Sequence, residues 1–289
     1  MRIGVAALVA AAAVAAACGS ARASLLPPGW KQIKSGPAGG TVWEGEIPDA
    51  PWGHSFTHSY VYLPPNVSRT KRYPVLYALH GFYGSPSSIV YGIALGDAAD
   101  QLIQQGRVRP FIMVAPSGNS STLYGGEWTG PRESFVVDTV LPWTDAHLPT
   151  IRSRSGRALA GLSAGAYGAV DIALRHPRLF ATAESWSGYF KPITDGTLHG
   201  GSRAELAAHD PSQLARGEAL LLRRLGTRFF LSCGSTHDRV TASFARAFAQ
   251  ELSALRLRHS LVLLPGGHNG AFWRAQLPAA LEYAFSPAA

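Results

Sequence analysis

Gly161-Leu162-Ser163-Ala164-Gly165 is the stretch of sequence that decides the fold. The apolar run 157–160 precedes it, and the helix-like stretch 166–176 follows it. This order predicts a strand, a tight turn and a helix, with the serine at the apex of the turn. Flanking glycines are typical of such a turn, because its strained backbone leaves no room for neighbouring β-carbons. An ordinary glycine-rich turn is the alternative interpretation.

Other apolar runs extend this unit into a sheet. Nearly continuous apolar runs, typical of strands covered on both faces, occur at Val75–Leu79, Phe111–Ala115, Arg157–Leu162, Phe229–Cys233 and Ser260–Leu264. Helical patterns lie between them, at residues 95–103 and 244–255. The alternation predicts a single α/β domain over residues 41–289, with a mostly parallel central sheet flanked by helices. Two alternating runs, 41–47 and 56–63, predict an antiparallel pair with one wet face.

The first residues have the pattern of a targeting segment. Met1-Arg2 is followed by an apolar run to Ala17 and by the cleavage-like Ala21-Arg22-Ala23. We therefore expect residues 1–23 to be a signal peptide, residues 24–40 to be an N-terminal lead-in, and the mature protein to be secreted. The alternative is a lipoprotein whose lipidated N-terminus is Cys18.

Charge and cysteine content limit the partners that we expect. The net charge of +8 comes mostly from arginines that are scattered along the chain, so the sequence does not indicate nucleic-acid binding. No stable protein partner is implied. If Cys18 is removed, Cys233 has no intrachain partner, and its place in an apolar run indicates a buried structural thiol.

A serine becomes a nucleophile when a base takes its proton and a third group orients the base. The best candidate for the base is His268, because it follows a late predicted strand in a glycine turn that opens the last helix. The candidate acid is Asp238, which follows the preceding strand. Its alternative role is the N-cap of the helix that begins near residue 240. Asp195 and Asp210 are weaker rivals for the acid.

An acyl-transfer site also needs donors for the oxyanion. We expect the Ala164 amide, at the start of a helix, and the Phe82 amide, in the loop after the first buried parallel strand. Aromatic side chains near strand ends are candidates for lining an acyl or aryl pocket, although core packing accounts for at least half of them equally well. The candidate substrate-binding residues are Tyr83, Trp128, Trp186 and Trp273.

His54 and His58 lie four residues apart, but without further ligands this spacing does not predict a metal site.

These motifs together resemble the esterase D family of α/β-hydrolases, which includes feruloyl and acetylxylan esterases, S-formylglutathione hydrolases and mycolyltransferases. The resemblance rests on Arg72 to Phe82, Gly161 to Ala169, Cys233-Gly234 leading to Asp238, and Gly266-Gly267-His268 leading to Phe272-Trp273, and it covers roughly residues 56–285. It implies cleavage or transfer of an acyl group through a serine acyl-enzyme, without metal or organic cofactor.

Our leading expectation is a secreted serine esterase that hydrolyses a small-molecule or polysaccharide-linked ester. A mycolyltransferase-like acyltransferase, which would pass the acyl group to a sugar hydroxyl, is the second hypothesis. The third is a surface binding protein that has lost turnover. The presence of Ser163, Asp238 and His268 in the expected order argues against the third.

Overall fold

A computed structural model describes residues 25–48, 58–118, 127–192, 198 and 200–287. The predicted signal peptide, Cys18, His54 and Asp195 lie outside the described residues. Within those residues the strands form one sheet in the order β1-β2-β3-β5-β4-β6-β7-β8-β9. The strands are β1 (Lys31–Ser35), β2 (Thr41–Gly45), β3 (Ser59–Leu63), β4 (Val75–Leu79), β5 (Ile112–Ala115), β6 (Arg157–Leu162), β7 (Thr182–Trp186), β8 (Arg228–Gly234) and β9 (Arg258–Leu264).

The six neighbouring strands β5, β4, β6, β7, β8 and β9 are all parallel, which confirms the predicted mostly parallel sheet. Their register brings the ends of β4, β6 and β7 to within one residue of one another: Leu79 pairs with Gly161, and Leu162 pairs with Trp186. Because parallel strands all end at the same edge, the segments that follow β4, β6, β8 and β9 share one rim of the sheet.

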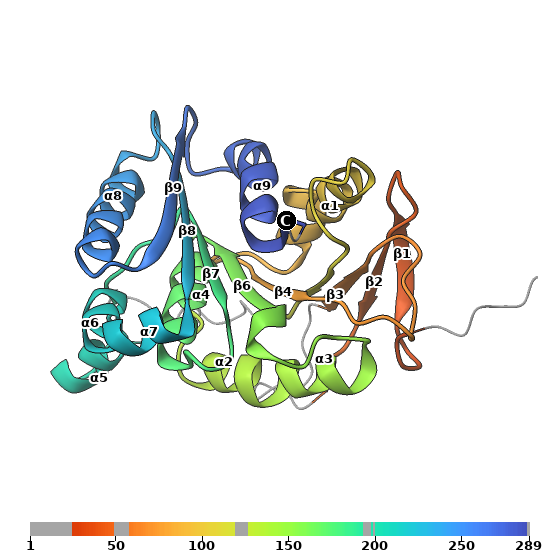
Figure 1. The fold of residues 1–289 in the computed structure, drawn as a ribbon, viewed down its shortest axis with the longest axis horizontal. Helices are drawn as coiled ribbons and strands as arrows, with labels where there is room; N and C mark the ends of the chain where they lie inside the picture. Colours follow the sequence, from red (N-terminus) through yellow and green to blue (C-terminus); the bar gives the residue numbers. More distant parts are fainter. Residues whose placement is uncertain (1–24, 49–57, 119–126, 193–197, 199, 288–289) are drawn as a thin grey trace, which may run out of the picture.

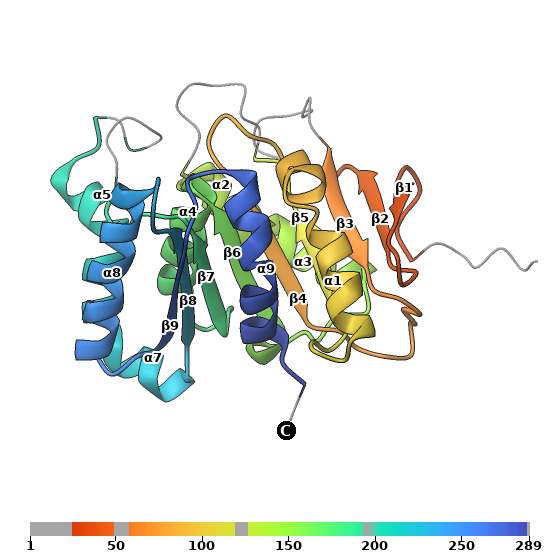
Figure 2. The same ribbon diagram turned by 90° about the horizontal axis from the view of Figure 1, so that it is seen from above.

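Helices cover both faces of the sheet. They are α1 (Leu95–Gln104), α2 (Pro131–Ser134), α3 (Leu141–His147), α4 (Ala164–Arg175), α5 (Arg203–Ala208), α6 (Pro211–Gly217), α7 (Ala219–Leu225), α8 (Arg239–Ala254) and α9 (Gly270–Phe285), with short helical turns η1 (Ser88–Gly92), η2 (Phe135–Val140) and η3 (Arg154–Gly156). Helices α1 and α9 lie on one face, while α2, α3 and α4 lie on the other (Figures 1 and 2).

Alternate residues of the central strands feed two separate cores. Tyr77 of β4 packs on the side of α4 and α8, whereas its neighbours Leu76 and Ala78 pack on the side of α1 and α9. All three side chains are fully buried, as expected for a strand covered on both faces. In the part of the chain that the structure describes, no helix is long and apolar enough to span a bilayer.

The antiparallel end of the sheet differs in two respects from the expectation. Every residue of β3 is buried, so this strand lacks the wet face that the alternating pattern predicted. The predicted pairing of β2 with β3 is confirmed, but the lead-in also contributes a strand, β1, that pairs with β2. β1 is polar, with Lys31, Gln32 and Lys34 among its five residues, as suits an exposed edge strand. For the same reason the sequence shows no apolar run at this strand.

Asp100 of α1 fastens this end of the sheet to the rest of the domain. Its buried carboxylate accepts hydrogen bonds from the Tyr62 hydroxyl at 2.7 Å and from the Ala38 and Gly40 amides at 2.9 and 3.0 Å. A β-carbon on Gly36 or Gly40 would lie 2.3 or 2.0 Å from the carboxylate oxygens, so glycine permits this close approach. The second half of the lead-in is therefore part of the folded domain.

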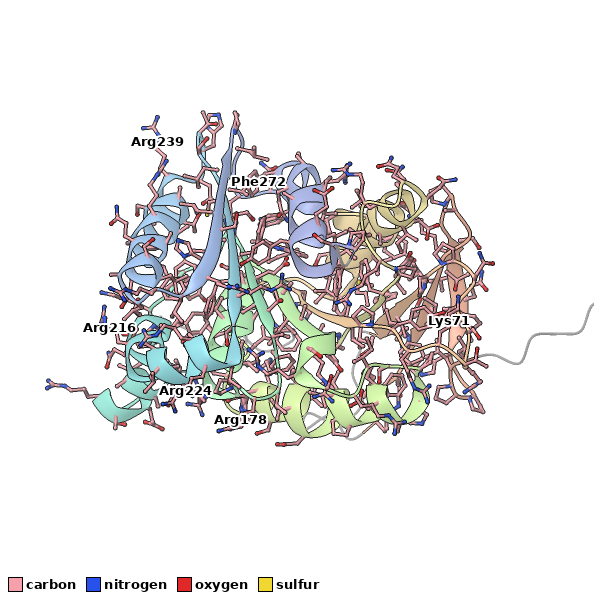
Figure 3. The ribbon with its side chains drawn as sticks, in the orientation of Figure 1. Lys71, Arg178, Arg216, Arg224, Arg239 and Phe272 are labelled. Atoms are coloured by element: carbon pink, nitrogen blue, oxygen red, sulfur yellow. The ribbon has the colours of Figure 1, made fainter. Side chains whose placement is uncertain are left out.

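Basic side chains are spread over the surface. Lys71, Arg178, Arg216, Arg224 and Arg239 point outward from separate parts of the molecule (Figure 3). This distribution agrees with the scattered pattern in the sequence.

We predict that Asp100→Ala lowers the free energy of unfolding by about 3 kcal/mol or more, because it strips buried donors of a charged acceptor. Urea denaturation measures the change. The matched control is Asp97→Ala, three residues earlier on α1, which removes a partly exposed ion pair with Lys34. It should cost about 1 kcal/mol or less. Equal losses in the two variants would contradict the anchoring role of Asp100.

Candidate active site

Ser163 stands at the turn between β6 and α4 in a strained conformation. Its φ is 54° and its ψ is −115°, a region that serine rarely adopts. The Ser163 amide donates to the Trp186 carbonyl of β7 at 3.0 Å, and the Ser163 carbonyl accepts from the Ala166 amide in the first turn of α4. The neighbouring strand and the helix thus hold the backbone on both sides of the serine.

The two flanking glycines are required by close packing, as the sequence predicted. A β-carbon on Gly161 would lie 2.2 Å from the Gly165 carbonyl oxygen. A β-carbon on Gly165 would lie 2.3 Å from the carbonyl oxygen of Leu79, at the end of β4. Both distances are far inside van der Waals contact, so the turn closes onto itself and onto β4 only with glycine at these positions.

His268 and Asp238 are brought together at the same rim. The Asp238 carboxylate lies 3.0 Å from His268 Nδ1, and Asp238 is buried while His268 is partly exposed. Asp238 does occupy the N-cap position of α8, but its side chain makes no capping hydrogen bond. The carboxylate is directed to the histidine and not to the helix. The rival Asp210 caps α6 through the Gln213 amide instead.

Backbone contacts fix the two loops that carry this pair. The His237 amide donates to the Gly266 carbonyl at 2.8 Å, and the Gly266 amide donates to the Thr236 hydroxyl at 2.9 Å. A β-carbon on Gly234 would meet the backbone of Gly266 at 2.7 Å. The loop after β8 and the loop after β9 therefore form one unit that sets the distance between Asp238 and His268.

The loop after β4 lies against the serine. A β-carbon on Gly81 would come within 3.3 Å of the Ser163 β-carbon. Among the described residues, neither the Phe82 amide nor the Ala164 amide has a backbone acceptor. Ala164 is also the first residue of α4, where the helix dipole favours negative charge. The two amides are available to an oxyanion at Ser163.

His80 is the main support of that loop, and its contacts leave no signal in the sequence. Its Nε2 accepts from the Gly118 amide at 3.0 Å, so Nδ1 carries the proton and donates to the Gly81 carbonyl at 2.9 Å. The Trp128 indole donates to the His80 carbonyl at 2.9 Å. Burial lowers the pKa of His80 to about 4, so the ring stays neutral and keeps these bonds.

The four aromatic candidates fall into two groups. Tyr83 is 71% exposed, and Trp273 is half-buried with its ring 5.0 Å from that of His268. Trp128 and Trp186 are only 1% and 0% exposed. Core packing therefore accounts for both of these side chains, which corrects the expectation that they line a substrate pocket. They support the site from behind, Trp128 through His80 and Trp186 through the Ser163 amide.

The thiol of Cys233 is buried, and burial raises its pKa to about 11. Such a group is not a nucleophile at neutral pH. The structural interpretation of Cys233 agrees with this placement.

Comparison with known proteins identifies the family. The model of the esterase family described as "Putative esterase" matches residues 54–284. The chain belongs to this esterase family. It is 32% identical over 146 residues to an endo-1,4-beta-xylanase/feruloyl esterase of Xylanibacter ruminicola, covering 47% of this chain and 19% of that protein. It is 28% identical over 247 residues to an esterase of Mycobacterium tuberculosis, covering 72% of this chain and 51% of that protein. The chain thus spans about half or less of the length of these two relatives.

Solved structures share the fold at lower identity. A ferulic acid esterase superposes with a TM-score of 0.70 at 20% identity, covering 89% of this chain and 96% of that one. The feruloyl esterase module from Clostridium thermocellum, complexed with sinapinate, gives a TM-score of 0.67 at 19% identity, with 88% and 93% coverage. These similarities establish the α/β-hydrolase fold of the esterase domain.

Glu184 is an ionisable group buried directly behind the site. It lies on β7, and its Oε2 accepts from the Trp186 indole at 3.0 Å. Its Oε1 has no partner among the described residues. Burial raises the pKa of Glu184 to about 8, so the carboxyl is protonated at neutral pH in the folded chain.

We predict that this group makes stability fall as pH rises. Between about pH 4.5 and 8 the unfolded chain has released the Glu184 proton while the folded chain retains it, so each pH unit removes up to about 1.4 kcal/mol. Glu184→Gln should remove this slope in urea unfolding measured from pH 5 to 8. Glu282→Gln, which changes an exposed carboxylate paired with Arg107, is the control and should keep it. A wild-type slope in Glu184→Gln would contradict the assignment.

Proposed function

We propose that the chain is a serine carboxylesterase in which Ser163 is the nucleophile, His268 the general base and Asp238 the group that orients the base. The observation that carries the proposal is the hydrogen bond between His268 Nδ1 and Asp238, made at the same sheet rim as the strained Ser163 turn. Asp238 binds His268 and makes no capping hydrogen bond to α8. A catalytic role explains this choice of partner more directly than a role in stability does.

The proposal includes a path for each proton. Because Nδ1 of His268 donates to Asp238, Nε2 is the nitrogen left to take the Ser163 hydroxyl proton. The serine oxygen then attacks the ester carbonyl, and the resulting oxyanion is received by the Phe82 and Ala164 amides. His268 returns the proton to the leaving alcohol, which gives the acyl-enzyme. Water, activated by the same nitrogen, releases the acid and restores the serine.

The substrate class that we propose is a short acyl or aryl ester, either small or attached to a polysaccharide. The exposed ring of Tyr83 and the ring of Trp273 beside His268 offer aromatic surfaces at the rim. The feruloyl esterases among the relatives and structural neighbours support the same class. We also propose that the protein is secreted, on the basis of the pattern in residues 1–23, with lipidation at Cys18 as the alternative.

We propose hydrolysis and not acyl transfer. Transfer competes with hydrolysis only where the site keeps water away from the acyl-enzyme. Helix α5, in the described part of the segment after β7, has no buried residue and begins with a polar capping box between Ser202 and Glu205. A polar, solvated segment of this kind favours water as the acceptor. The intact Asp238 to His268 pair favours an active enzyme over an inactive binding protein.

We predict that Ser163→Ala abolishes both fluorophosphonate labelling and hydrolysis of a chromogenic acetate or ferulate ester, because it removes the atom that becomes acylated. The matched control is Ser187→Ala. Ser187 also has a positive φ of 60° at a strand end, but it is fully buried. This control should label like the wild type. Labelling of a folded Ser163→Ala variant would refute the nucleophile.

We predict that Asp238→Asn lowers kcat about 10³- to 10⁴-fold, because an amide stabilises the wrong tautomer of His268 and no longer offsets the charge of the imidazolium. Steady-state kinetics with the same ester measure this. Asp210→Asn changes the acid that caps α6 and should leave kcat within about tenfold of wild type. A near-normal rate for Asp238→Asn would transfer the acid role to Asp195 or Asp210.

A further inference from the structure

A second polar cluster lies on the far side of α4 from the catalytic turn. Glu133 of α2, Asp171 of α4 and His209 at the end of α5 each offer one potential metal-ligating atom, and these three atoms lie within 4.8 Å of one another. The side chains of Asp171, Glu133 and His209 are 0%, 8% and 12% exposed. Asp171 lies eight residues after Ser163, about 12 Å along the helix axis.

Asp171 lacks a full set of partners. Its Oδ2 lies 2.7 Å from His209 Nδ1, but its Oδ1 is buried without a hydrogen-bond partner among the described residues. A buried carboxylate oxygen left unpaired is costly, by about 1 to 3 kcal/mol or more.

Glu133 is oriented by two groups that bind the same oxygen. Arg175 Nε and His176 Nε2 lie 2.7 and 2.8 Å from its Oε1, which leaves Oε2 for a further ligand. Contacts of this kind fix metal-binding carboxylates in known sites.

We propose that Glu133, Asp171 and His209 bind a zinc ion, with a water molecule as the fourth ligand of the tetrahedral ion. One imidazole nitrogen and two carboxylate oxygens match the ligands that Zn²⁺ takes, whereas Ca²⁺ and Mg²⁺ take oxygen ligands alone. A tetrahedral ion about 2.1 Å from each ligand would hold the three atoms about 3.4 Å apart, so shifts of about an ångström or less close the site. Zinc would give Asp171 Oδ1 its missing partner and would join α2 and α5 to α4. The site does not depend on the proposed esterase activity.

The test is zinc stoichiometry in the full-length chain. The protein is treated with EDTA, dialysed against a small excess of ZnCl₂, passed over a desalting column and analysed by mass spectrometry for metals. The His268→Ala background is used because the His268 and Asp238 pair could itself bind zinc. We expect about one zinc per chain, and a rise in Tm of about 5 to 10 °C at a zinc concentration a hundred times the Kd. MgCl₂ at the same concentration should give no rise.

His209→Gln and Asp171→Asn should each lower zinc affinity at least tenfold in a competition with a chromogenic chelator. His209 is near the surface, so its variant remains informative if Asp171→Asn fails to fold. His259→Gln changes a partly buried histidine that contacts Ser253, far from the cluster in sequence, and should bind zinc like the parent. Zinc below about 0.1 per chain, or unchanged zinc affinity in folded His209→Gln, would overturn the proposal. The cluster would then be a set of hydrogen bonds that joins the helices.

Discussion

The contact between Gly165 and the end of β4 sets the geometry of the whole site. A β-carbon at Gly165 would lie 2.3 Å from the Leu79 carbonyl oxygen, so the first turn of α4 can approach the sheet only at this glycine. That approach brings Gly81, in the loop after β4, beside Ser163. The strained serine conformation costs about 1 to 3 kcal/mol and persists because strands on both sides and the helix behind it over-determine the turn. One packing constraint thus places the proposed nucleophile and the loop that carries a proposed oxyanion donor.

Buried polar bonds keep the loop after β4 in a single conformation. His80 contacts the chain through both ring nitrogens and its carbonyl, and Arg132 Nε donates to the Gly118 carbonyl at 2.6 Å. In a buried site each of these groups would be costly without its partner, so alternative loop conformations are excluded by desolvation. Because burial keeps the pKa of His80 near 4, this support survives at any pH where the base can work.

The sequence predicted strands well where both faces are covered. The apolar runs correspond to β4, β5, β6, β8 and β9 within one or two residues. The sequence did not predict β7, because Glu184 and Ser185 interrupt its apolar pattern. A lone buried carboxyl cannot be recognised from local sequence. The sequence did not predict β1, because this edge strand is polar.

The site residues were harder to decide from sequence. An aspartate before a helix suits both an N-cap and a catalytic acid, and only the side-chain direction of Asp238 separates the two roles. Exposure of a tryptophan likewise depends on packing that the sequence does not encode locally, as Trp128 and Trp186 demonstrate. The Glu133, Asp171 and His209 cluster left no signal, because its members are 38 residues apart and come from three helices.

Helix α4 separates the parts of the molecule that must stay fixed from those that can vary. Every residue from Ala164 to Leu174 is buried, so α4 cannot rotate or slide without unpacking the core. Helix α5, by contrast, has no buried residue and is joined to α4 through His209, whose carbonyl accepts from the Tyr167 hydroxyl and whose ring binds Asp171. Substitutions in α5 can therefore reshape the surface beyond β7 without moving Ser163.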